Sequence, residues 1–142
     1  MREPSLVLTE KLAELDAYSH NVLHQFPRME KFILSAAMRI TMREMQRLSV
    51  VAWKRRQKSA ALFDLDVQIE LFRRDIRKAH GYGYINDRRL DIWMRHVNEI
   101  GNLVGGWIKH EREKEEAARE KSPHHRGAAP TRRGGSHAVT PN

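Results

Sequence analysis

Five large apolar residues, spaced alternately three and four positions apart, lie between positions 62 and 76 of this 142-residue chain. They are Leu62, Leu65, Ile69, Phe72 and Ile76. This spacing places them on one side of an α-helix and is typical of the buried seam of a helical bundle. The pattern recurs nearer the C-terminus at Leu90, Trp93, Val97, Ile100, Val104 and Trp107. Each run predicts a long helix whose apolar side must pack against other helices.

Helix breakers divide the rest of the chain into two further helices. One is predicted from residue 5 to about 26, with an apolar stripe at Leu8, Leu12, Leu15 and Val22. The next is predicted from Pro27 to about residue 56, because proline suits the first position of a helix. Residues 80–84, HGYGY, end the third helix, and Asn86 or Asp87 can cap the fourth. Short connections favour antiparallel neighbours, so we predict an all-α, antiparallel up-down-up-down four-helix bundle.

Length and composition limit the chain to one such domain. We assign residues 1–120 to the bundle and residues 121–142, which have no acidic residue and many Pro, Gly and Ser, to a disordered basic tail. The absence of cysteine excludes disulfides, thiolate metal sites and a cysteine nucleophile. No apolar run approaches the roughly 18 residues of a membrane span, and no signal peptide begins the chain. A cytoplasmic protein without membrane contact is expected.

Positive charge is concentrated in the second helix and its flanks. The whole chain carries a net charge of +8, and residues 27–58 contain nine lysines and arginines against two glutamates. Arg39, Arg43 and Arg47 follow one another by one helical turn, where like charges repel unless they bind a polyanion. A merely solvated face is the alternative interpretation. The predicted nucleic-acid-binding residues are Arg28, Arg39, Arg43, Arg47, Lys54, Arg55, Arg56, Lys58, Arg74 and Lys78.

The apolar arc of the second helix, counted from Ile33, spans roughly 160°, which is wider than one bundle seam needs. Leu34, Met38 and Met45 are the surplus. We predict that they contact a second subunit, so that the protein is a homo-oligomer; a broad surface facing the core is the alternative.

Glu44 lies near the middle of the same arc, where an unpaired carboxylate would be costly. Arg73 or Arg77 of the third helix could reach it. A buried ion pair that fixes the register of the two helices is therefore expected, rather than a catalytic acid.

Glycines interrupt the fourth helix at Gly101, Gly105 and Gly106, just before Trp107. A glycine in a helix interior costs about 1 kcal/mol relative to alanine, so a compensating close approach of a neighbouring helix is expected there. Whether that neighbour belongs to the same chain or to another subunit is left open.

Catalytic and metal-binding patterns are not found. His20 and His24 are one turn apart, but the glutamate of an HExxH site is absent, and surface histidines are the simpler interpretation. Residues 81–84, GYGY, lack the lysine and serine or threonine of a phosphate loop. Tyr82 and Tyr84 could stack on unpaired bases, although loop packing is favoured. We predict no enzyme activity, no cofactor and no metal.

Three segments resemble a known family. They are FPRMEKF at residues 26–32, LFRRDIRKAH at residues 71–80 and EIGNLVGGWI at residues 99–108. In this order, on a basic four-helix bundle, they are similar to the accessory variability determinant (Avd) family of diversity-generating retroelements. The relatives usually end soon after the fourth helix, whereas this chain continues.

The resemblance implies a homopentamer of four-helix bundles without enzymatic activity. It also implies two partners, the element's reverse transcriptase and the structured RNA that contains the template repeat and its flanks, and a role in mutagenic cDNA synthesis. The alternative is a generic nucleic-acid-binding bundle related to the proteins encoded in ribosomal-RNA intervening sequences. A DNA-binding bundle is less consistent, because no recognition-helix motif is evident.

Overall fold

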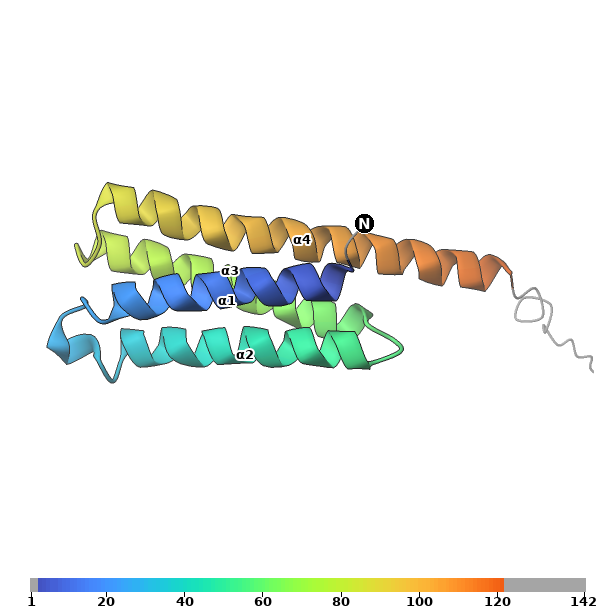
Figure 1. Ribbon diagram of the computed structural model, residues 1–142, viewed down its shortest axis with the longest axis horizontal. Helices are drawn as coiled ribbons and strands as arrows, with labels where there is room; N and C mark the ends of the chain where they lie inside the picture. The colour runs from blue at the N-terminus through green and yellow to red at the C-terminus, as the bar shows by residue number, and fades with distance from the viewer. Residues whose placement is uncertain (1–2, 122–142) are drawn as a thin grey trace, which may run out of the picture. The chain divides into compact units, whose positions relative to one another are not determined.

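The computed structural model describes residues 3–121, and these are helical apart from their connections. The helices are α1 (Pro4–Leu23), the single 3-10 turn η1 (Arg28–Glu30), α2 (Leu34–Lys54), α3 (Ser59–Gly81) and α4 (Asp87–Glu120). The chain divides into two compact units after Glu111. Up to that residue, successive long helices run in opposite directions (Figure 1). The predicted all-α, up-down-up-down four-helix bundle is therefore confirmed.

The second unit contains the last turns of α4, in which residues 112–121 are all exposed. The tail predicted at residues 121–142 lies outside the described residues except for Lys121. No helix within residues 3–121 is long and apolar enough to cross a membrane.

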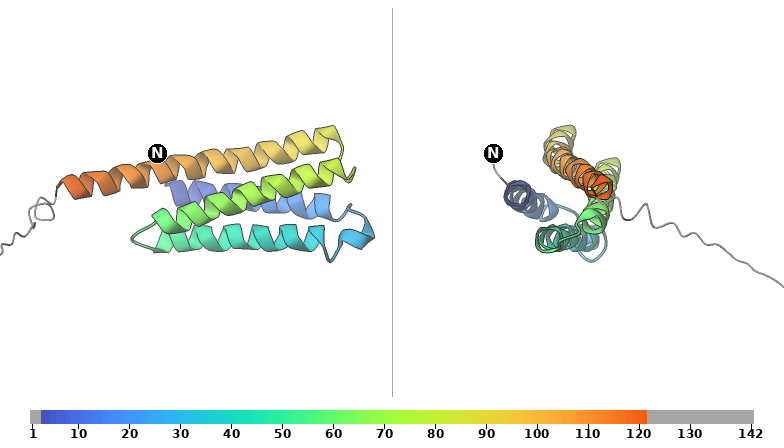
Figure 2. Two further views of the ribbon diagram at one scale, coloured as in Figure 1. Left: turned by 180° about the vertical axis from the view of Figure 1, so that it is seen from behind. Right: turned by 90° about the vertical axis from the view of Figure 1, so that its right-hand side faces the viewer.

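Trp93 of α4 is fully buried and joins three helices at the centre of the bundle. Its indole Nε1 donates a hydrogen bond to the Ser19 hydroxyl of α1 at 2.8 Å. The ring of Phe72 on α3 meets it edge-on, with 5.9 Å between ring centroids. The end-on view in Figure 2 shows the helices gathered around this core. The apolar runs predicted for α3 and α4 supply much of it, and Leu65, Ile69 and Val97 are fully buried.

Helix α2 begins seven residues later than predicted. Pro27 precedes η1 instead of opening α2, and the backbone of Ile33 leaves the helical region, with φ −117° and ψ −94°. The Glu30 carboxylate then accepts a hydrogen bond from the Leu34 amide at 3.2 Å, which satisfies one of the first-turn donors that no helical carbonyl can reach. This local cap makes Leu34 the better starting point.

The predicted surplus on α2 is also corrected. Leu34, Met38 and Met45 are buried within the bundle and cannot contact a second subunit, whereas Ile33 and Ile40 are exposed. The wide apolar arc is divided in this way because the small residues Ser35 and Ser49, which are buried with Met42, share the inward side of α2.

The connections between helices are short and internally bonded. Gly83 adopts the left-handed conformation, φ +81°, which favours glycine. The Asn86 side chain then accepts a hydrogen bond from the Arg89 amide at 2.9 Å, so that Asn86 rather than Asp87 caps α4. This turn fixes α3 and α4 as antiparallel neighbours.

Candidate nucleic-acid interface

Arg39 and Arg43 of α2 form the centre of the predicted basic strip. Both are exposed, and within residues 3–121 no carboxylate lies within ion-pair distance of either. They line a shallow groove of about 220 Å³ between α1 and α2 together with His20. The Arg39 guanidinium donates to Nδ1 of His20 at 3.2 Å. These two arginines therefore present positive charge that no protein carboxylate neutralises.

Arg47 differs from its neighbours because Glu44 pairs with it. Two nitrogens of the guanidinium donate to the two carboxylate oxygens at 2.9 and 2.7 Å. Glu44 is 35% exposed and lies one turn before Arg47, so it reaches this partner without leaving its own helix. The hydrogen bond from Arg47 lowers the pKa of Glu44. The expected buried pair of Glu44 with Arg73 or Arg77 is wrong, and so is an unbroken arginine strip.

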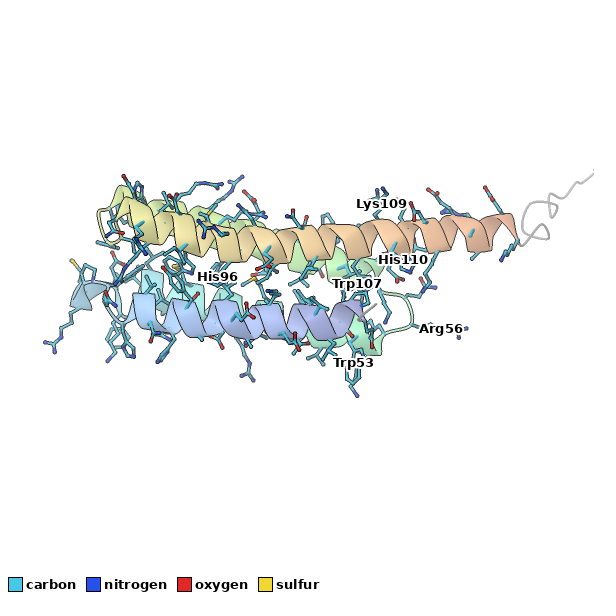
Figure 3. The ribbon with its side chains drawn as sticks, turned by 45° about the horizontal axis from the view of Figure 1, so that its top comes forward. Trp53, Arg56, His96, Trp107, Lys109 and His110 are labelled. Carbon is cyan, nitrogen blue, oxygen red and sulfur yellow. The ribbon has the colours of Figure 1, made fainter. Side chains whose placement is uncertain are left out.

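Cations at the C-terminal end of α2 divide into two kinds. Lys54, Arg55 and Arg56 are exposed, and Figure 3 shows Arg56 and Trp53 pointing outward. The Lys58 ammonium instead donates to three backbone carbonyls, those of Ala52, Trp53 and Arg55, at 2.6, 3.1 and 2.6 Å. A cation there favours the negative end of the helix dipole. The geometry of Lys58 is that of a cap on α2.

The two cations predicted on α3 both have acidic neighbours. Arg74 contacts Glu70 at 3.3 Å, and Lys78 lies 4.0 Å from Asp75. Hydrogen bonds from Arg73 and then Arg74 lower the pKa of Glu70, whereas burial raises the pKa of Asp75. This part of the surface has mixed charge, in contrast to that around Arg39 and Arg43. Arg28, before α2, is exposed like those two arginines.

The glycines of α4 have different surroundings. A Cβ added to Gly101 would lie 2.3 Å from Nη2 of Arg73, so this glycine leaves room for a side chain and not for a neighbouring backbone. Gly105 and Gly106 have nothing within 4 Å of such a Cβ inside the described chain. The close helix approach predicted at these glycines is therefore absent from the subunit. Trp107 is buried, and in Figure 3 it points from α4 toward the neighbouring helices.

Glu30 is a structural residue that the sequence reasoning missed. One oxygen caps α2 and the other accepts a hydrogen bond from the Tyr84 hydroxyl at 2.5 Å. This bond raises the pKa of Tyr84 to about 12. The Tyr84 ring packs against Phe26 with 5.3 Å between centroids, which agrees with the loop-packing interpretation, while Tyr82 is exposed. A glutamate three residues after Pro27 was the available signal.

A row of exposed apolar side chains runs along α3. Phe63, Val67 and Leu71 follow one another by one turn and are 65%, 41% and 45% exposed. We call these three residues the α3 apolar row. Large apolar side chains aligned on one exposed helix face are typical of contact surfaces.

No group of three or more His, Asp or Glu side chains within residues 3–121 is arranged to hold a metal ion. The His20 and His24 rings instead contact each other edge-on at 4.6 Å.

A family model described as bAvd-like matches residues 6–111, which contain all three segments of the predicted resemblance. The chain belongs to the bAvd-like family. The match ends where the first compact unit ends, at Glu111. A search of curated proteins finds no match.

Proposed function

We propose that this protein is a non-catalytic accessory protein of a diversity-generating retroelement. It binds the element's reverse transcriptase and the structured RNA that contains the template repeat, and it supports mutagenic cDNA synthesis in the cytoplasm. The observation that carries the proposal is the family match over residues 6–111, combined with the exposed, unpaired Arg39 and Arg43 on α2.

Phosphate contacts explain why those arginines matter. Arginines on a rigid helix neutralise RNA phosphates and release the condensed counterions, a gain that grows with each contact. An arginine already paired with a carboxylate must first give up that pair. Arg39 and Arg43 therefore contribute most to RNA binding, Arg28, Lys54, Arg55 and Arg56 extend the surface, and Arg47, Arg74 and Lys78 contribute less.

Self-association is part of the proposal. The resemblance implies a homopentamer, and the α3 apolar row is the surface that we assign to contact with a second copy, in place of the buried Leu34, Met38 and Met45. Burying Phe63, Val67 and Leu71 removes apolar area from water, which favours association. Repetition of the basic surface around a ring would let several subunits bind one RNA.

Co-purification with the reverse transcriptase tests the proposal. The gene should lie near a reverse-transcriptase gene and a template repeat, and the tagged protein should retain that reverse transcriptase together with the template RNA. The Arg39→Glu/Arg43→Glu variant should lose the RNA, while a matched Arg95→Glu/Lys109→Glu variant on α4 should keep it. A gene inside a ribosomal-RNA intervening sequence, with no reverse transcriptase recovered, would contradict the retroelement function and favour the generic nucleic-acid-binding bundle.

A further inference from the structure

A pocket of about 340 Å³ opens where η1 meets the start of α2. Its wall includes Arg28, Lys31 and Arg39, with His24 and Ser35, and no aspartate or glutamate lines it. The volume falls at the lower end of the range for small-molecule sites. Three permanent cations around one concave space favour an anion as its occupant.

The Ser35 hydroxyl is the unusual group in this pocket. Ser35 is only 4% exposed, and its oxygen is the one buried side-chain polar atom within residues 3–121 that has no hydrogen-bond partner. Hydroxyls elsewhere in these helices bond to the carbonyl four residues earlier, as Thr9 does with Ser5 and Thr41 with Ala37. Ser35 is too close to the start of α2 for that. Because buried polar groups are nearly always paired, the hydroxyl points to a ligand.

Backbone amides at the same place add to this evidence. Ser35 and Ala36 belong to the first turn of α2, where no helical carbonyl can accept their N–H groups. Glu30 caps only the Leu34 amide, and its second oxygen is bonded to Tyr84. The first turn of a 21-residue helix therefore offers amide donors and the positive end of the helix dipole beside the unpaired hydroxyl.

We propose that this pocket binds a phosphate group. The Ser35 hydroxyl and the first-turn amides donate hydrogen bonds to its oxygens, while Arg28 and Lys31 neutralise its charge. The inference rests on the proposed function for the source of that phosphate, which is RNA. Either an internal phosphodiester or a terminal phosphate of the RNA has the required chemistry.

Titration of the full chain with inorganic phosphate, followed by backbone amide NMR, tests the pocket. Chloride at the same ionic strength is the control anion. Phosphate should shift the amide resonances of Ser35 and Ala36 with saturation. Ser35→Ala should weaken binding about tenfold, the effect of losing one hydrogen bond to a charged group. Ser35→Ala removes an unpaired buried hydroxyl and should fold normally.

Charge is tested separately from the hydroxyl. Lys31→Gln should weaken phosphate binding as well, whereas Arg95→Gln, an equal change of charge on α4, should not. The proposal is overturned if the Ser35 and Ala36 amides do not respond, or if Ser35→Ala binds phosphate as wild type does. It is also overturned if Arg95→Gln weakens binding as much as Lys31→Gln.

Two RNAs of one sequence, with a 5′-phosphate or a 5′-hydroxyl, distinguish the sources. Equal loss of affinity for both RNAs in Ser35→Ala assigns the pocket to an internal phosphodiester, and loss for the phosphorylated RNA alone assigns it to the terminal group. Wild-type RNA affinity in Ser35→Ala and Lys31→Gln would overturn the inference while leaving RNA binding by α2 intact. Phosphate binding without any RNA binding would instead contradict the proposed function and leave the phosphate site standing.

Discussion

Alanine substitutions at Gly101 and Gly105 should have different effects although both glycines lie in α4. Replacing an exposed helical glycine by alanine stabilises a protein by about 1 kcal/mol, because alanine loses less conformational freedom on folding. Gly105 has open space around it, so Gly105→Ala should gain this amount. At this chain length the melting temperature should rise by about 4 °C.

Gly101→Ala meets the Arg73 side chain. The new Cβ would lie 2.3 Å from Nη2, so the guanidinium must move. Arg73 is only 20% exposed and donates to Asn98 at 2.9 Å and to Glu70 at 3.1 Å. Losing a bond of this kind costs about 1.5 kcal/mol or more, less where solvent screens the partner, which offsets the gain in helix propensity. Gly101→Ala should therefore be neutral or destabilising.

Chemical denaturation of the two variants checks this difference, and an Arg73→Ala background isolates its cause. With Arg73 truncated, Gly101→Ala should stabilise as much as Gly105→Ala does, a coupling of about 1 kcal/mol. Equal stabilisation by both alanines in the wild-type background would refute the assignment of Gly101 as the space for Arg73.

Three other predictions concern single contacts. Phe63→Glu should reduce the assembly to a species of 16.6 kDa in light scattering without loss of helicity, and a mass already at that value in the wild type would contradict self-association. Tyr84→Phe should reduce stability below pH 10 and lose this effect between pH 10 and about 12, because the Tyr84 pKa is raised from 10.0 in the folded state by Glu30; stability curves against pH that run parallel through this window would refute it. Glu44→Gln should strengthen RNA binding by releasing Arg47, and unchanged affinity would show that this arginine lies outside the interface.

Much of the fold could be predicted because α3 and α4 carry strict apolar spacing. Leu65, Ile69 and Phe72 are buried as their pattern indicates. The inward side of α2 could not be predicted in the same way, since Met38 and Ile40 are equally apolar in sequence but only Met38 faces the core. A helical wheel gives the angles between side chains and does not say where the neighbouring helices lie.

The candidate site was predictable only in part for a related reason. Sequence located the cations of α2, and Arg39 and Arg43 are indeed exposed. It could not show that the Glu44 carboxylate turns toward Arg47, or that the Lys58 ammonium turns back onto carbonyls of α2. Those outcomes depend on side-chain rotamers and on the way each helix ends, which no residue spacing encodes.

The central claim is that the α2 surface of the folded bundle binds RNA, and the salt dependence of binding tests it most directly. Affinity for the template RNA should be measured over a range of salt for wild type, for Arg39→Glu/Arg43→Glu, and for a chain that lacks residues 122–142. The double variant should keep its helicity and oligomer mass, bind RNA far more weakly, and lose between about 1.4 and 1.8 from the slope of log K against log salt, or 0.7 to 0.9 for each contact. Deletion of the tail should weaken binding only modestly. Wild-type affinity and slope in the double variant, with loss of binding on deletion of residues 122–142, would contradict the claim.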